Sequence, residues 1–219
     1  MELTLVIANK NYSSWSLRAW LLLKHIGAPF REMRVPLGQP DTPAQIRKWS
    51  PSGLAPVLLD GELAIWDSLA IGEYLHEKFP AARLWPEHFA ARARARSICA
   101  EMHSGFSALR QNMPFNGSRH FSGRPINADT RANIERISAI WRECRAEFAD
   151  RGPFLFGHFT IADAMYAPVA LRFLTYDAPL DAQAARYAAT LAELAPVQEW
   201  LASARLEPER LEKYEPAPL

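Results

Sequence analysis

The chain has 219 residues, a length that suits one large domain or two modest ones. Its 25 Lys and Arg residues nearly balance its 24 Asp and Glu residues, so a net charge of +1 provides no field to hold a nucleic-acid backbone or an anionic bilayer. Apolar residues make up 49% of the chain and charged residues 22%, values typical of a globular protein. We expect a folded protein with no nucleic-acid and no membrane partner.

Two further features concern the compartment. No run approaches the roughly 18 apolar residues of a membrane span, and residues 3–8 resemble a strand more than the apolar core of a signal peptide. Cys99 and Cys144 have neither CxxC nor metal-ligand spacing, which predicts free thiols in a reducing compartment and no metal site. We expect a cytoplasmic protein.

The first 80 residues alternate between strand and helix patterns. A short apolar run over residues 3–8 predicts a buried strand, and a run with helical period over residues 15–26 ends at Gly27. Apolar and polar residues then alternate over residues 30–37, and a cap followed by a proline opens a short helix over residues 41–49. This start predicts a βαβ unit followed by a second helix.

A hairpin and a third helix complete this region. Asp60-Gly61 lies between two apolar runs, and Asp-Gly is a strong hairpin signal because both central residues of a type I′ turn need positive φ. Asp67 and Ser68 can then cap a helix that runs to Pro80. The predicted order is βαβαββα, which forms a first domain over residues 1–80.

Beyond Pro80 the pattern is helical only. Residues 81–86 form the expected linker, and an all-helical second domain follows over residues 87–219. Thr160 and Asp163 have the spacing of a capping box, which predicts the start of a helix. Helical periodicity extends over residues 87–112, 128–150 and 186–204.

Pro56 is the first of three features that could carry chemistry. It heads a predicted strand, where a proline cannot donate a ladder hydrogen bond. Either an ordinary trans proline opens the strand or the Ala55–Pro56 bond is cis, which would turn the backbone of Ala55 towards a peptide-like ligand. We expect the cis bond.

The other two features are polar residues at helix starts. Asp67 and Ser68 could bind the ammonium and carboxylate of a ligand, or they could only cap their helix. Ser13, Ser14 and Trp15 stand in the first strand-to-helix loop, where open α/β sheets bind ligands. A serine hydroxyl there could donate to an anion or cap the helix, and no GxSxG motif marks a serine nucleophile.

These features together resemble the cytosolic glutathione S-transferases over essentially the whole chain. The resemblance rests on the order βαβαββα, the proline before the third strand, the acidic-Ser pair and the Thr-x-x-Asp box in a helical domain. Residues 13–18, Ser-Ser-Trp-Ser-Leu-Arg, are similar to the Ser-Ser-Cys-x-x-Arg motif of the zeta class, which includes maleylacetoacetate isomerases. The resemblance implies a thioredoxin-like N-terminal domain followed by an all-helical C-terminal domain.

It also implies a glutathione transferase, which activates the glutathione thiol for attack on a small electrophile. Ala55, beside Pro56, would pair with the cysteinyl backbone of glutathione, and Asp67 with Ser68 would hold its γ-glutamyl end. The hydroxyl of Ser13, with Ser14 as the alternative, would stabilise the thiolate at the helix start near Trp15. Trp15 stands where the zeta class has cysteine, which disfavours the isomerase activity. Residues 1–80 contain no cysteine, which disfavours disulfide chemistry.

The electrophile would lie between the domains, and Arg119 could attract an acidic substrate. The family implies a homodimer, for which the Arg-rich segment 92–96 supplies charges that need a partner or water. Two alternatives stay open, namely a glutathione-dependent isomerase of the maleylacetoacetate type and a binding module without turnover. The expected apolar wall of the electrophile site consists of Met102, His103, Phe106 and Met113.

Overall fold

The computed structural model describes residues 2–215, so the expected outer ends of the two domains, residues 1 and 219, lie outside the described part. The N-terminal region is a four-stranded sheet in the order β2-β1-β3-β4. The strand β1 pairs parallel with β2 and antiparallel with β3, which pairs antiparallel with β4. The strands are β1 (Leu3–Ile7), β2 (Phe30–Arg34), β3 (Val57–Asp60) and β4 (Leu63–Trp66).

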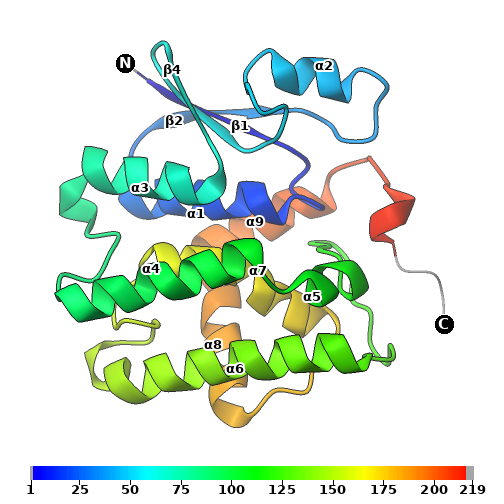
Figure 1. Cartoon of the computed structure of the whole chain (residues 1–219). Helices are drawn as coiled ribbons and strands as arrows, with labels where there is room; N and C mark the ends of the chain where they lie inside the picture. Colours follow the sequence, from blue (N-terminus) through cyan, green and yellow to red (C-terminus); the bar gives the residue numbers. More distant parts are fainter. Residues whose placement is uncertain (1, 216–219) are drawn as a thin grey trace.

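Three helices belong to this sheet, and the predicted order βαβαββα is confirmed. Figure 1 shows α2 on one side of the sheet and α1 with α3 on the other, facing the rest of the chain. The helices are α1 (Ser14–Ile26), α2 (Thr42–Arg47) and α3 (Ser68–Lys78), and a short 3-10 turn over Pro80–Ala82 follows.

The side chains of β1 alternate between two cores. Leu3, Leu5 and Ile7 are buried in the large core that the sheet shares with the helices. Val6 points to the other face and packs with Ile46 of α2 in a small second core. A strand buried on both faces needs apolar residues throughout, which is why residues 3–8 read as a continuous apolar run.

The hairpin between β3 and β4 differs from its prediction by one residue. Its two-residue turn is Gly61-Glu62, because Asp60 still pairs with Leu63 in the ladder. Only Gly61 has positive φ (61°), so the turn does not have the two positive φ angles of type I′. The carboxylate of Asp60 instead accepts from Tyr74 and Lys78 of α3, which ties the hairpin to that helix.

The second region is helical, as predicted, but its helices are shorter than the sequence periodicity suggested. The predicted 87–112 helix breaks at Gly105 and Phe106, where Phe106 has φ 58°, and the predicted 186–204 helix breaks before Pro196. Thr160 and Asp163 form the predicted capping box. The helices are α4 (Phe89–Ser104), α5 (Ser107–Asn112), α6 (Ala128–Phe148), α7 (Ile161–Thr175), α8 (Ala182–Ala192) and α9 (Ala195–Arg205), with 3-10 turns over Ala149–Arg151 and Glu212–Tyr214.

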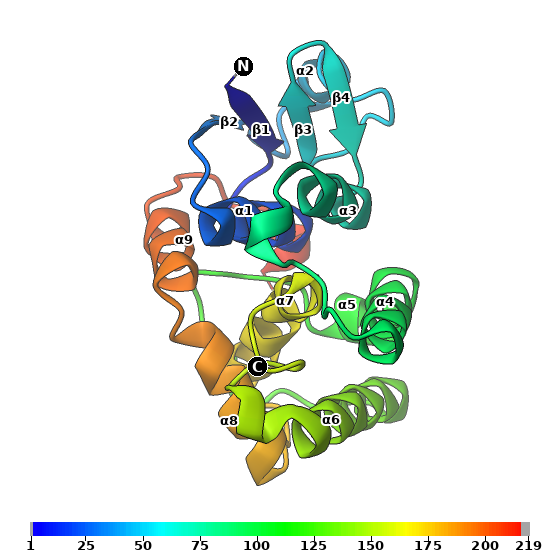
Figure 2. The ribbon, with the colours of Figure 1, turned by 90° about the vertical axis from the view of Figure 1, so that its left-hand side faces the viewer.

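Figure 2 shows α1 and α3 between the sheet and the second region, with α7 directly beneath them. Helix α7 packs on α1 and is buried on nearly every side. The two regions therefore share one continuous core, and the linker contributes Leu84 and Trp85 to it.

The Arg-rich segment 92–96 finds its partners within the chain. Arg94 pairs with Glu147 (2.8 Å) and Arg96 with Glu73 (3.1 Å), while Arg92 donates to backbone carbonyls. These arginines point in different directions, as expected, but their charges do not call for a second subunit. Cys99 and Cys144 are buried free thiols. No helix within residues 2–215 is long and apolar enough to cross a membrane.

Candidate functional site

A cleft of ≈ 540 Å³ opens where the first turns of α1 and α3 meet the loop before β3 and the last turn of α4. Four segments that are far apart in the sequence contribute to it. Its lining is Trp15, Ser52, Leu54, Ala55, Pro56, Trp66, Asp67, Ser68 and His103, of which the sequence had pointed to Trp15, Ala55, Pro56, Asp67, Ser68 and His103.

The loop before β3 forms one wall. The Ala55–Pro56 bond is cis, so this prediction is confirmed, and Val57 begins the strand directly after it. The loop turns at Gly53 (φ 70°), and the Ser52 hydroxyl accepts a hydrogen bond from the N–H of Leu54 at 3.2 Å. Ser52 and Leu54 were missed, because Ser-Pro-Ser-Gly indicates a turn but not which side faces a ligand.

Asp67 is the N-cap of α3, and both of its carboxylate oxygens are engaged. Its Oδ1 accepts from the N–H groups of Leu69 (2.8 Å) and Ala70 (3.3 Å), with its own backbone at φ 74°. Its Oδ2 contacts His103 Nε2 at 3.0 Å. A ligand ammonium at Asp67 would therefore share Oδ2 with a histidine from the second region.

Ser68 differs from Asp67 in having no partner for its hydroxyl. It is 1% exposed, lines the cleft at the first turn of α3, and its Oγ makes no hydrogen bond among the described residues. A buried hydroxyl without a partner costs about 1–3 kcal/mol, which a ligand group bonded to it would recover. Ser68 is also not the cap of α3, because Asp67 fills that position.

Trp15 is the residue of the first turn of α1 that reaches the cleft. Its ring lies 4.1 Å from the guanidinium carbon of Arg18 and 5.2 Å from that of Arg110. The ring of His103 meets it edge-on, with centroids 5.2 Å apart. The indole therefore stands between the cleft and two cations, in a geometry that favours cation–π attraction.

Arg18, Arg110 and Arg172 form a cationic cluster behind Trp15. Arg18 donates to the carbonyl of Met165, and its Nη1 has no partner in the part of the chain that the structure describes. Arg172 donates to the carbonyl of Met113, and Arg110 donates to the carbonyls at the end of α4. None of the three pairs with a carboxylate of the described residues.

Burial and mutual repulsion outweigh the attraction of Asp67 for Arg18, so the pKa values of the buried arginines are lowered. Burial, with the nearby charges of Arg172 and Arg110, lowers the pKa of Arg18 to about 9. Burial and Arg110 lower the pKa of Arg172 to about 10. Both groups stay charged at neutral pH, so the cluster creates a positive potential that an anion in the cleft would relieve.

The two candidate serines have different surroundings. Ser13 is the N-cap of α1, and its Oγ accepts from the N–H of Ser16 (3.2 Å) and donates to Ser16 Oγ (2.8 Å). Ser14 Oγ lies 3.5 Å from Arg172 Nη2, and no described residue accepts its proton. Both serines are buried beside the cleft without lining it.

Of the four residues predicted to form the apolar wall of the electrophile site, one lines the cleft. Met102 and Met113 are buried in the main core, and Phe106 packs against that core from a half-buried position. His103 is the member of the wall that lines the cleft. Arg119 lies in a separate hollow and pairs with Glu215 at 2.7 Å.

No sequence pattern pointed to Arg110 and Arg172. They lie on α5 and α7, far from the motif at residues 13–18, and only the folded chain brings Arg110 to the Trp15 ring and Arg172 to Ser14. Arg18 was visible as the last residue of that motif, but its burial was not. A buried arginine has no sequence pattern of its own.

Two family comparisons cover most of the chain. The sequence model of the glutathione S-transferase N-terminal domain matches residues 12–78, and that of the C-terminal domain matches residues 89–203. A probable maleylacetoacetate isomerase of Vibrio cholerae is 50% identical over 64 residues, which cover 27% of this chain and 30% of that protein. The matched segment thus spans less than a third of that relative.

A zeta-class glutathione S-transferase of Euphorbia esula is 30% identical over 159 residues, which cover 70% of this chain and 66% of that protein. Among solved structures, a glutathione transferase homologue from Burkholderia with bound glutathione has a TM-score of 0.69 at 23% identity, covering 94% of this chain and 98% of that one. That likeness concerns the fold. With both domain models matched, the chain belongs to the glutathione S-transferase family.

Proposed function

We propose that this protein is a glutathione transferase that binds glutathione in the cleft and activates its thiol for attack on an electrophile. One observation carries the proposal. The cis Ala55–Pro56 bond, the Asp67–Ser68 pair and Trp15 at the start of α1 line a single cleft, although the sequence pointed to a ligand at each of them separately.

The polar groups of the cleft suit the γ-glutamyl end. The free hydroxyl of Ser68 and the N-terminus of α3 favour a carboxylate, and Asp67 Oδ2 favours an ammonium. Ala55 offers backbone groups to the middle of the peptide. The relatives solved with bound glutathione support this choice of ligand.

Activation of the thiol is assigned to the start of α1 and to the arginine cluster. A free thiol with a pKa of about 8.5 is mostly protonated at pH 7, and a cation about 7 Å away stabilises its thiolate by roughly 2 kcal/mol at an effective dielectric constant of about 20. Arg18 and Arg110 lie directly behind Trp15, which lines the cleft. Ser14 is the preferred hydroxyl donor, because Ser13 already donates to Ser16.

The electrophile is proposed to lie beside Trp15 and His103, with Phe106 at the edge. Met102 and Met113 would shape this place from behind, and Arg119 would contribute only if its pair with Glu215 opened. An isomerase of the maleylacetoacetate type is the second candidate, favoured by the relative of that name.

A homodimer and a cytoplasmic location complete the proposal. The homodimer is supported by the family alone, since the arginines at 92–96 are paired within the chain. Light scattering at micromolar concentration would contradict it by giving the monomer mass of 24.7 kDa. The buried free thiols of Cys99 and Cys144 suit a reducing compartment.

Steady-state assays with glutathione and a chlorodinitrobenzene test the proposal. We expect a rate that saturates with glutathione and exceeds the uncatalysed reaction, together with an absorbance increase near about 240 nm when glutathione binds at pH 7, because its thiolate forms. Saturable binding without turnover or thiolate would favour a binding module. Absence of binding at millimolar glutathione would refute the proposal.

A further inference from the structure

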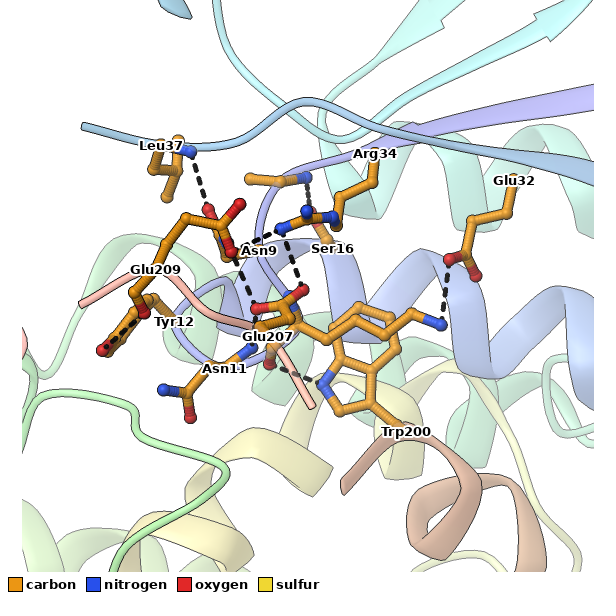
Figure 3. Close-up of polar contacts among 12 residues, drawn as sticks. Asn9, Asn11, Tyr12, Ser16, Glu32, Arg34, Leu37, Trp200, Glu207 and Glu209 are labelled. Carbon is orange, nitrogen blue, oxygen red and sulfur yellow. Dashed lines mark hydrogen bonds and ion pairs between the residues drawn. The ribbon is translucent and has the colours of Figure 1, made fainter. Parts of the chain in front are cut away.

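The C-terminal segment, residues 206–215, returns from the end of α9 to the loop that joins β1 to α1. Figure 3 shows Glu207 and Glu209 from this segment directed at that loop, which comprises residues 9–12. The next residues, Ser13 to Trp15, form the helix start beside the cleft. Residues almost 200 positions apart therefore meet next to the site.

Glu207 binds the backbone of the loop directly. Its carboxylate accepts from the N–H of Lys10 at 2.7 Å, from the N–H of Asn11 at 3.0 Å and from Asn9 Nδ2 at 3.2 Å. The side chain is 7% exposed, and Arg34 Nη1 at 3.5 Å partly compensates its charge. Hydrogen bonds from backbone N–H groups to a carboxylate are among the stronger ones in proteins.

The carbonyls of the same two loop residues are also bound from the second region. Trp200 Nε1–H donates to the carbonyl of Lys10 at 2.9 Å, and the N–H of Gly117 donates to the carbonyl of Asn11 at 2.9 Å. The peptide groups of Lys10 and Asn11 thus receive their partners from outside the sheet domain.

Hydrogen bonds also connect this loop to the first turn of α1. The N–H of Ser13 donates to the carbonyl of Asn9 at 2.8 Å, and the Asn9 side chain is bound by Glu207 and Glu209. Asn9 Oδ1 in turn accepts from the N–H of Leu37 at 2.6 Å. A change at Glu207 would therefore shift the N-cap of α1 as well as the loop.

We infer that Glu207 is a positioning residue, which sets the start of α1, and with it Ser14 and Trp15, at the place where the thiol is activated. This inference rests on the proposed function. Glu207 does not line the cleft, and it acts through the loop, by way of the Lys10 and Asn11 backbone and the Asn9 side chain. Small displacements of groups around a reacting atom cost large factors in rate.

The variant Glu207→Gln tests the inference, with Glu199→Gln as the matched control. Glu199 lies on α9 and pairs with Lys24 at the far end of α1, so its variant removes a carboxylate without touching the loop. In Glu207→Gln the amide N–H₂ group would face a backbone N–H, so one of the two backbone bonds is lost.

We expect the Lys10 and Asn11 amides of Glu207→Gln to exchange with deuterium at least about tenfold faster than in the wild type and in Glu199→Gln. We also expect the pKa of bound glutathione to rise by about one unit and kcat at pH 7 to fall about tenfold, with glutathione Kd changed less than about threefold. A charge effect alone has the opposite sign, because removing a nearby negative charge would lower the thiol pKa.

Amide exchange unchanged in Glu207→Gln, or faster exchange with an unchanged or lowered thiol pKa, would overturn the inference. Failure of the proposed function is separate, since it would appear as a wild type that binds no glutathione or forms no thiolate. In that case the exchange measurement still decides whether Glu207 fixes the loop.

Discussion

The starts of α3 and α7 each carry an acidic and a hydroxyl side chain, and both have a capped first turn, but only at α7 is every polar atom of the pair hydrogen bonded within the described residues. At α7, Asp163 Oδ2 accepts from the N–H and hydroxyl of Thr160 (2.8 and 3.0 Å), and Oδ1 accepts from the N–H of Leu155 (3.0 Å) and the hydroxyl of Tyr187 (2.8 Å). At α3, Ser68 lines the cleft, and its buried hydroxyl has no partner within residues 2–215. A saturated helix start stabilises the fold, whereas an unsaturated one is available to a ligand.

The largest expected effect on stability comes from removing the Asp163 carboxylate at the start of α7. Asp163→Ala leaves four buried donors without an acceptor, and we expect it to lower the free energy of unfolding by about 3–5 kcal/mol. Urea denaturation measures this loss. A loss below about 1 kcal/mol would mean that water replaces the carboxylate as acceptor. A fully hydrogen-bonded helix start would then not identify a residue that stabilises the fold.

The next effect concerns the cations behind Trp15. Arg172→Met removes a buried charge without a carboxylate partner, so we expect the pKa of bound glutathione to rise by about one unit or more. The rate deficit should be largest at neutral pH and shrink as the pH rises, because the thiolate then forms without help. Ultraviolet titration of bound glutathione checks the shift, and a deficit independent of pH would contradict it.

Ser68→Ala sharpens the comparison with Asp163. We expect glutathione Kd to rise about tenfold while the free energy of unfolding stays the same or increases slightly, because the lost hydroxyl had no partner and Asp67 remains the cap. Calorimetry and urea denaturation measure the two quantities, with the exposed Ser97→Ala as control. A lower free energy of unfolding with an unchanged glutathione Kd would mean that Ser68 stabilises the fold, as Asp163 does, and does not bind the ligand.

The smallest effect separates the two serines of α1. Ser14→Ala should raise the pKa of bound glutathione by about half a unit, since Ser14 has a free proton beside Arg172. Ser13→Ala should leave that pKa unchanged and instead cost about 0.5–2 kcal/mol of stability, as loss of an N-cap does. If Ser13→Ala raised the thiol pKa and Ser14→Ala lowered only the stability, Ser13 would be the residue that contacts the thiolate.

Local sequence signals predicted most of the first region. Asp67-Ser68 and Ala55-Pro56 were found because a cap and a misplaced proline are visible in a few residues. The predicted hairpin turn was wrong by one residue, because Asp60 pairs with Leu63 as the last residue of its strand.

Contacts between segments that are far apart in the chain could not be predicted from the sequence. The arginine cluster joins side chains of α1, α5 and α7, and Glu207, in the segment after α9, accepts from the backbone of Lys10 almost 200 positions earlier. The Ser13 hydroxyl was assigned to a thiolate from its motif, but its hydrogen bond to Ser16 depends on the rotamer in the folded loop. Such features require the three-dimensional structure.

A crystal structure of the protein grown with glutathione tests the central claim most directly. We expect the γ-glutamyl carboxylate within hydrogen-bond distance of Ser68 Oγ, the peptide backbone beside Ala55, and the sulfur at the start of α1 near Trp15. Glutathione bound away from this cleft, or Ser68 Oγ still without a partner in the occupied cleft, would contradict the claim that the unsaturated helix start is the glutathione site.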